Sequence, residues 1–273
     1  MTMDSEHLVS FKRWFSDYVA AYYTGDPARN GTVRLKEEHT ERVCEEIVML
    51  GAALNLPTQD RLLAETVALF HDLGRFKQYA TYGTFEDAAS EDHAALGLRE
   101  LAKDRVLSIC SEAEQSLIND AIGYHNVRTL PHDGDQRILF FAQLLRDADK
   151  LDIWRVFIDY YDRQYEQQDS TIVWGLPNDP ACSPKVVDAL RRQEMADTRH
   201  MATLNDYKLL QISWIFDVNF RPTLRAVHER QYIDRIAATL PQTKEIRKII
   251  RTVLAYLQAR QCLADATGGD KDS

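Results

Sequence analysis

The stretch Ala68-Leu69-Phe70-His71-Asp72-Leu73-Gly74-Arg75-Phe76 decides the interpretation of this sequence, because an apolar run ends there in an adjacent imidazole and carboxylate. Neither group is stable beside an apolar core unless another group pairs with it. Leu63 and Val67 lie eight and four residues before His71, so on a helix the histidine continues the buried face. Gly74 is expected to end this helix. Imidazole and carboxylate are ligands of Zn, Mn and Fe, so the pair suits a metal, and a hydrogen-bonded core pair is the alternative.

The composition favours an all-α fold. Of 273 residues, 45% are hydrophobic, and only 11 glycines and 8 prolines interrupt the chain, so long helices around a sizeable core are expected. The 33 basic and 42 acidic side chains give a formal net charge of -9. This balance disfavours a nucleic-acid partner, which would require a basic surface.

The four cysteines form no C-x-x-C pair, which argues against a disulfide framework or a zinc finger and favours a reducing, cytoplasmic location. The first residues lack the basic start and apolar core of a signal peptide. No apolar run approaches the roughly 20 residues that a membrane helix requires. We therefore expect a cytoplasmic protein without a membrane partner.

Apolar residues at helical spacing predict a series of helices separated by short breaks. The expected helices cover residues 7–23, 33–54, a segment from 58 to the His71-Asp72 pair, 112–124, 138–160, 206–218, 221–240 and 243–264. Residues 76–92 are expected to form a long loop. One helical domain over 1–264 is the simplest organisation, with a metal-binding core at about 33–160, C-terminal helices over 183–264 and a disordered tail over 265–273. Residues 166–200 form either a lid or a surface excursion.

Four further side chains are expected to face the interior. His39 lies on the apolar face of its helix, and His125 ends the buried stripe of residues 112–124. His93 falls in the first turn of a helix, and Gly97 four residues later permits close packing over a site. Asp149 is centred on the inward face of residues 138–160, where an unpaired carboxylate favours a cation partner. Taken singly, His39 is explained as a core histidine and His93 as a surface histidine near a helix cap.

Together these groups suggest a site for two metal ions. His39, His71, Asp72 and Asp149 could hold one cation, while His93 and His125 complete a neighbouring position and Asp72 bridges the two. The cofactor is then one or two divalent ions per chain, of the group Mn, Fe, Co, Mg, Ni and Zn.

The order His39, His71-Asp72, Asp149 resembles the H…HD…D signature of the HD-domain metal-dependent phosphohydrolase superfamily, an all-α bundle. His93 and His125 resemble the additional histidines of its six-ligand, two-metal branch. The resemblance covers about residues 33–160. The cyclic-dinucleotide phosphodiesterases of this branch commonly have two consecutive histidines where this chain has His125-Asn126, and their glycine-tyrosine-proline marker is absent here, which argues against that activity.

The resemblance implies hydrolysis of a phosphomonoester or phosphodiester, nucleotide-like, by a water whose pKa two cations lower. Asp72, Arg75 and Lys150 are the predicted catalytic residues, and Arg75, Lys150 and Lys208 the predicted substrate ligands, although a surface role explains Lys208 as well. The partner is thus a small phosphoester or nucleotide, and a homodimer stays open. Relatives with the same six ligands include mixed-valent diiron oxygenases, so an oxygenase is the alternative, together with a non-catalytic nucleotide sensor.

Overall fold

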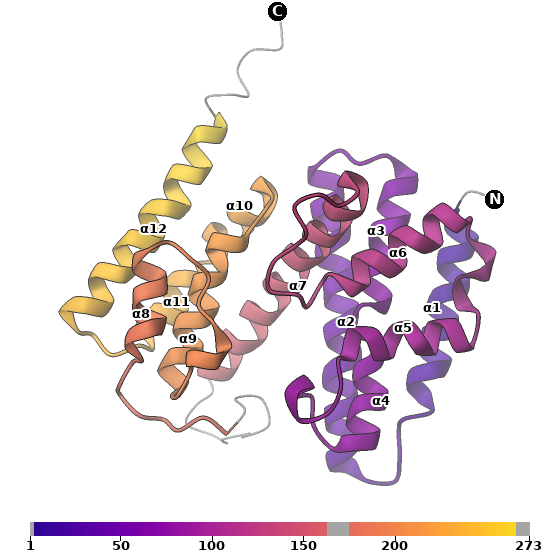
Figure 1. Cartoon of the computed structure of the whole chain (residues 1–273), viewed down its shortest axis with the longest axis horizontal. Coiled ribbons are helices and arrows are strands. Elements are labelled where there is room, and N and C mark those ends of the chain that lie inside the picture. The colour runs from indigo at the N-terminus through magenta and orange to yellow at the C-terminus, as the bar shows by residue number, and fades with distance from the viewer. Residues whose placement is uncertain (1–2, 163–174, 266–273) are drawn as a thin grey trace, which may run out of the picture. The chain divides into compact units, whose positions relative to one another are not determined.

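Every regular element in residues 3–162 and 175–265, the part of the chain that the computed structural model describes, is a helix (Figure 1). The predicted all-α fold is confirmed. The chain divides into two compact units, residues 1–152 and 153–273. The expectation of a single domain stays a prediction, as does the lid over 166–200. Residues 163–174, which include the start of that segment, and residues 266–273 of the predicted tail lie outside the described residues.

The first unit is built from helices that follow one another closely along the chain. They are α1 (Ser5–Ala20), α2 (Pro27–Ala53), α3 (Thr58–Phe70), α4 (Leu73–Tyr82), α5 (His93–Lys103), α6 (Glu112–Gly123) and most of α7 (Gln136–Asp162), with short 3-10 turns at Asp87–Ala89 and Val106–Ile109. Helix α3 packs against α1, α2 and α6, and α4 packs against α5. The rings of Phe11 and Phe70 pack edge to face in the core between α1 and α3, with their centres 5.5 Å apart.

Two boundaries differ from the sequence expectation. Helix α2 begins six residues early, because Asp26 caps it by accepting from the amide of Ala28 and Pro27 occupies its first position. Helix α3 ends at Phe70 rather than at Gly74. A new helix, α4, begins directly after Asp72 and runs to Tyr82, so the predicted loop over 76–92 was wrong in its first half.

The second unit contains α8 (Pro184–Arg191), α9 (Leu204–Ser213), α10 (Arg221–Glu229), α11 (Tyr232–Ala238) and α12 (Lys244–Asp265), with 3-10 turns at Thr198–His200 and Trp214–Asp217. The single helix predicted over 221–240 is divided at Gln231, whose φ is 55°. The core of the second unit includes the buried Trp154, whose indole nitrogen donates to the carbonyl of Gln211 at 3.0 Å. None of the described helices is long and apolar enough to span a membrane.

Candidate metal centre

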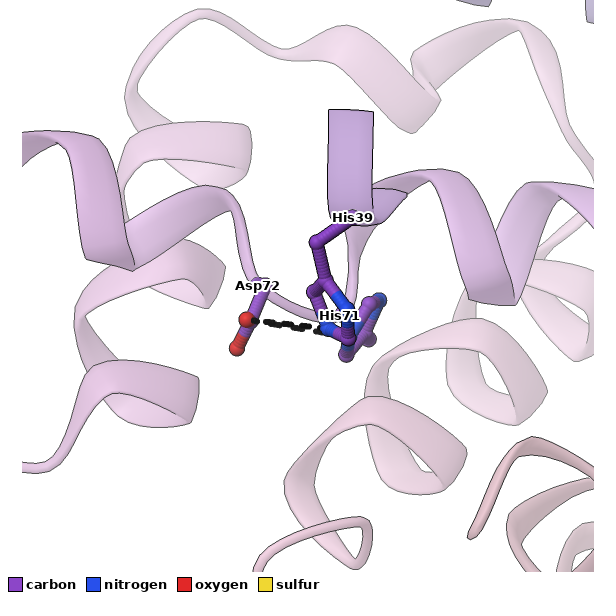
Figure 2. Close-up of side chains that lie close together, drawn as sticks. All are labelled: His39, His71 and Asp72. Atoms are coloured by element: carbon purple, nitrogen blue, oxygen red, sulfur yellow. Dashed lines mark ion pairs between the residues drawn. The ribbon is translucent and has the colours of Figure 1, made fainter. Parts of the chain in front are cut away.

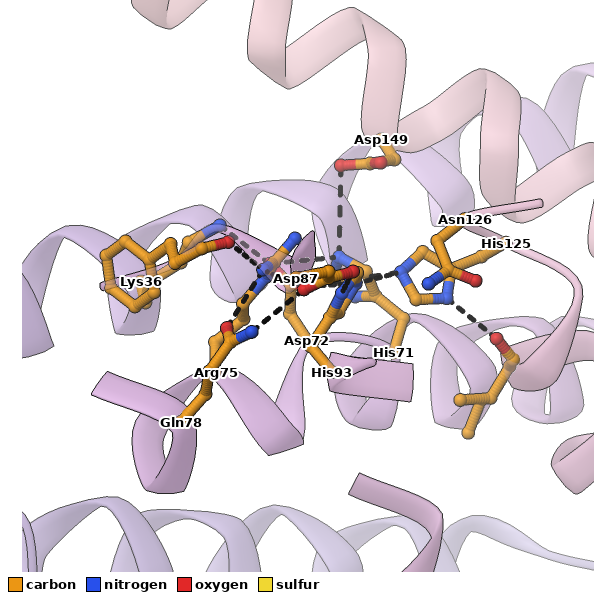
Figure 3. A network of polar contacts seen from close by, with 12 residues as sticks. Lys36, His71, Asp72, Arg75, Gln78, Asp87, His93, His125, Asn126 and Asp149 are labelled. Carbon is orange, nitrogen blue, oxygen red and sulfur yellow. Dashed lines mark hydrogen bonds and ion pairs between the residues drawn. The ribbon is translucent and has the colours of Figure 1, made fainter. Parts of the chain in front are cut away.

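The six predicted ligands meet in the first unit and come from five parts of the bundle. His39 lies in the middle of α2 (Figure 2). The pair His71-Asp72 forms the junction between α3 and α4, His93 begins α5, His125 follows α6, and Asp149 lies on α7 (Figure 3). Five of the six are at least nine-tenths buried, and the side chain of Asp149 is 20% exposed. The structure therefore brings together every residue that the sequence predicted as a ligand.

Asp72 lies at the centre of the cluster, with its two carboxylate oxygens facing different histidines. Oδ2 lies 3.6 Å from Nε2 of His39 and 3.8 Å from Nε2 of His71 (Figure 2). Oδ1 lies 3.3 Å from Nε2 of His93 and 3.9 Å from Nε2 of His125. The ligands form two halves, one of His39, His71 and Asp72 and the other of Asp72, His93 and His125. Each half offers three ligand atoms within 4.8 Å of one another, and Asp72 belongs to both. Asp72 is therefore shared by the two groups, and its role as a bridge between two metal ions stays a prediction.

In all four imidazoles, Nδ1 lies within hydrogen-bond distance of an oxygen that orients the ring. The Nδ1 atoms of His71 and His125 lie 2.7 Å from the backbone carbonyls of Ala68 and Ile122, and those of His39 and His93 lie 2.7 Å from carboxylate oxygens of Asp152 and Asp87. A carbonyl only accepts, so Nδ1 of His71 and His125 carries the proton and Nε2 presents its lone pair. Hydrogen bonds of this kind, made by the ring nitrogen that does not bind the metal, orient histidines in metal sites.

Several ligand atoms inside the cluster face one another closely. Nε2 of His71 is buried without a hydrogen bond and lies 3.8 Å from Oδ1 of Asp149, which is also 3.2 Å from Nε2 of His39. Nε2 of His93 and Nε2 of His125 lie 2.9 Å apart while both Nδ1 atoms are engaged elsewhere. Buried acceptors in such a group are unfavourable without a cation. The residues therefore fit divalent metal ions, whose preferred ligands are imidazole and carboxylate.

The electrostatic environment keeps most of these groups in the form that binds a metal. Burial lowers the pKa of His125 to about 3, and the neighbouring His93 contributes in the same direction. Burial alone would raise the pKa of Asp72, but the positive charges of Lys36 and other neighbours hold it well below its usual value. For His39, burial opposes the charged ring, yet hydrogen bonds to Asp149 and Asp152 raise its pKa to about 9. His39 is thus the ligand that must lose a proton.

Arg75 lies beside the cluster but is firmly held. Its Nε is 3.5 Å from Oδ1 of Asp72, and its Nη1 donates to Asp87 at 2.9 Å, to Gln78 at 2.9 Å and to the carbonyl of Phe85. Gln78 is fully buried and also donates to Asp87. Arg75 therefore holds Asp87, the acceptor of His93, in place and also lies next to Asp72.

Two glycines set how closely α5 approaches the ligand pair. A Cβ atom on Gly74 would lie 2.1 Å from the carbonyl oxygen of His93 and 2.6 Å from the amide of Gly97, and a Cβ on Gly97 would lie 2.9 Å from the amide of Gly74. This agrees with the close packing predicted at Gly97. Gly74 has a different role from the helix stop expected of it, because it allows α5 to place His93 beside Asp72.

The remaining predicted residues are placed as follows. Lys150 follows Asp149 on α7, is buried, and has Nζ 3.4 Å from the carbonyl of Arg146. Lys208 belongs to the second unit, where its buried ammonium donates to the carbonyl of Thr239 at 3.2 Å and lies 4.8 Å from the centre of the Tyr161 ring. Their roles with substrate stay predictions.

Sequence reasoning missed Lys36 and Asp87, which contact candidate ligands, and Gln78, which binds Arg75 and Asp87. Lys36 precedes His39 by three residues on α2, a spacing that places both on one helix face and could have revealed it. Asp152 follows Asp149 by three residues and is bound by both His39 and Arg42. Asp87 gave no such signal, because a 3-10 turn brings it to His93.

Comparison with protein families identifies this region. The family model of the HD domain matches residues 37–154. This segment is an HD domain. The matched range includes all six candidate ligands and the paired His71-Asp72. No curated protein and no solved structure matched the chain in the corresponding comparisons. HD domains are generally metal-dependent hydrolases, and the two ligand groups around Asp72 agree with that class.

Proposed function

We propose that this HD domain is a metal-dependent phosphohydrolase that acts on a phosphomonoester or phosphodiester with a nucleotide-like structure. The observation that carries the proposal is that four buried histidines, each fixed through Nδ1, direct Nε2 at the two oxygens of Asp72. When bound, divalent metal ions would supply Lewis acidity and an activated water for attack at phosphorus.

The side chains of the chain itself would orient the substrate and balance its charge. Ionised Asp72 joins the two halves of the site, and the guanidinium of Arg75, fixed by Asp87 and Gln78, presents a permanent positive charge next to it. A fixed guanidinium suits phosphate oxygens. We propose Arg75 and Lys150 as substrate ligands, with Arg75 supported by its distance from Asp72, while the role of Lys208 stays a prediction from the sequence.

The proposal is tested by replacing His71 or Asp72 with alanine. Changing an outer contact of a metal ligand costs about 10- to 100-fold in metal affinity or activity, so losing a ligand should cost more than about 100-fold in both. Metal content is measured by elemental analysis, and phosphate or nucleoside monophosphate release is measured on a phosphoester panel with Mn, Co, Fe or Mg. The exposed His132 and Asp133 provide matched alanine controls, which should behave like wild type. Unchanged metal content and turnover in both site variants would refute the assignment.

A diiron oxygenase is the second candidate, because four of the six candidate ligands are imidazoles, which suit iron, and one carboxylate faces both halves. Protein prepared without air distinguishes the two. An oxygenase would contain stoichiometric iron pairs, show an iron-dependent spectrum and consume oxygen with substrate. A hydrolase would release phosphate or a monophosphate under anaerobic conditions.

A further inference from the structure

We infer that Lys36 is a substrate-binding residue that neutralises Asp72 while the site is free of metal and turns to the anionic group of the substrate once metal is bound. The inference rests on the proposed function, because it requires a metal ion at Asp72. Lys36 lies one turn before His39 on α2, and its Nζ is 2.8 Å from Oδ2 of Asp72.

The ammonium of Lys36 and a metal ion would compete for the same oxygen. Oδ2 is the atom of Asp72 that faces His39 and His71, so it belongs to one of the two groups of candidate ligands. A metal ion bound by this group would repel the ammonium at short range. Loading the site with metal therefore favours a different position for Lys36.

Lys36 is able to move, in contrast to Arg75. Arg75 is held through Nη1 by three acceptors, whereas Asp72 is the only carboxylate among the described residues within ion-pair distance of Lys36. The side chain of Lys36 is 20% exposed and that of Asp72 is 5% exposed, so the lysine reaches the site from its solvent-facing side. The flexible four-carbon chain of a lysine allows its ammonium to turn without a change in the backbone.

The surroundings retain the displaced ammonium near the site. Nζ of Lys36 lies 5.3 Å from the centre of the Phe85 ring, a distance at which the ring face attracts a cation. The carbonyl of Phe85 accepts a hydrogen bond from Arg75, so the residue whose ring lies near Lys36 is fixed by the second cation beside Asp72. Lys36 and Arg75 approach opposite oxygens of one carboxylate. A phosphate group approaching the loaded site would meet both positive charges.

The test compares Lys36→Met with wild type in two titrations of the full chain. A hydrogen bond between charged groups changes an equilibrium constant by about 10- to 100-fold. A metal ion no longer has to displace the ammonium from Asp72 in Lys36→Met, so the metal-free variant should bind Mn²⁺ about 10- to 100-fold more tightly than wild type. With Mn²⁺ bound, the same variant should bind inorganic phosphate at least about 10-fold more weakly. Both affinities are measured by calorimetry.

The controls separate this inference from general effects of charge and folding. Lys12→Met removes a lysine of the same unit that pairs with Glu65 on the surface, and should change neither affinity. Lys36→Gln keeps a polar side chain without the charge and should repeat the result if the methionine variant does not fold, as judged by circular dichroism. Mn²⁺ affinity equal to wild type, or undiminished phosphate affinity, would overturn the inference and leave the proposed function standing. Absence of Mn²⁺ binding by wild type would overturn both.

Discussion

At the scale of single residues, the protonation of His39 depends on two carboxylates, one close to each of its ring nitrogens. Asp152 lies 2.7 Å from Nδ1 and Asp149 lies 3.2 Å from Nε2. Although burial disfavours the charged ring, these two carboxylates raise the pKa of His39 to about 9, above the ordinary value of 6.5. Below that pH the metal-free protein therefore holds a proton on the nitrogen that a metal ion needs.

Metal affinity should therefore rise with pH. Because binding releases the proton of His39, the affinity for Mn²⁺ should increase by up to about tenfold per pH unit between pH 7 and about 9 and then level off. Calorimetry at pH 7.5 in buffers of different ionisation enthalpy should detect about one released proton. The raised pKa also stabilises the metal-free fold fully below pH 6.5, and this contribution is lost as pH rises through about 9. An affinity independent of pH, with no proton released, would contradict this assignment of the proton.

At the scale of helices, periodicity predicted what local sequence determines and missed what depends on distant contacts. The apolar spacing of α2 and α7 correctly placed His39 and Asp149 on inward faces, because a helix repeats every 3.6 residues. Gly74 was wrongly taken as a helix stop, since glycine serves both as a terminator and as a point of close approach. Only the contact with Gly97 on α5 distinguishes these roles. The ion pair of Lys36 with Asp72 likewise joins residues 36 positions apart.

The crossing of α4 and α5 predicts the effect of Gly74→Ala. The added Cβ would lie 2.1 Å from the carbonyl oxygen of His93, so the helices must separate. We expect a loss of about 1–3 kcal/mol in the free energy of unfolding, as for overpacked cores, and weaker metal binding because His93 moves with α5. Urea unfolding and Mn²⁺ titration measure the two effects. Gly31→Ala in α2 is the matched control, because nothing lies within 4 Å of its Cβ and alanine favours a helix. Equal stability of the two variants would show that the close crossing does not require glycine.

At the scale of the whole molecule, the site and the family match coincide with one of the two units. The HD segment 37–154 ends two residues after the first unit ends at 152, and all six candidate ligands fall inside both ranges. Helix α7 carries Asp149 and Asp152 in the first unit and continues to Asp162 in the second. The chain therefore separates a unit that holds all six candidate ligands from a second unit that contributes none of them.

This division predicts where metal binding stabilises the chain. A ligand at 100 times its dissociation constant adds about 2.7 kcal/mol to the free energy of unfolding of the state that binds it. Hydrogen exchange measured with saturating Mn²⁺ and after treatment with a chelator should show slower exchange in the segments around His39, His71, His93 and His125. The helices α9 to α12 should change little, since their residues supply no ligand. Asp72→Ala provides the control, because without the bridging carboxylate the difference should disappear. Equal protection of both units in wild type would mean that metal binding stabilises the chain as one cooperative body, in agreement with a single domain.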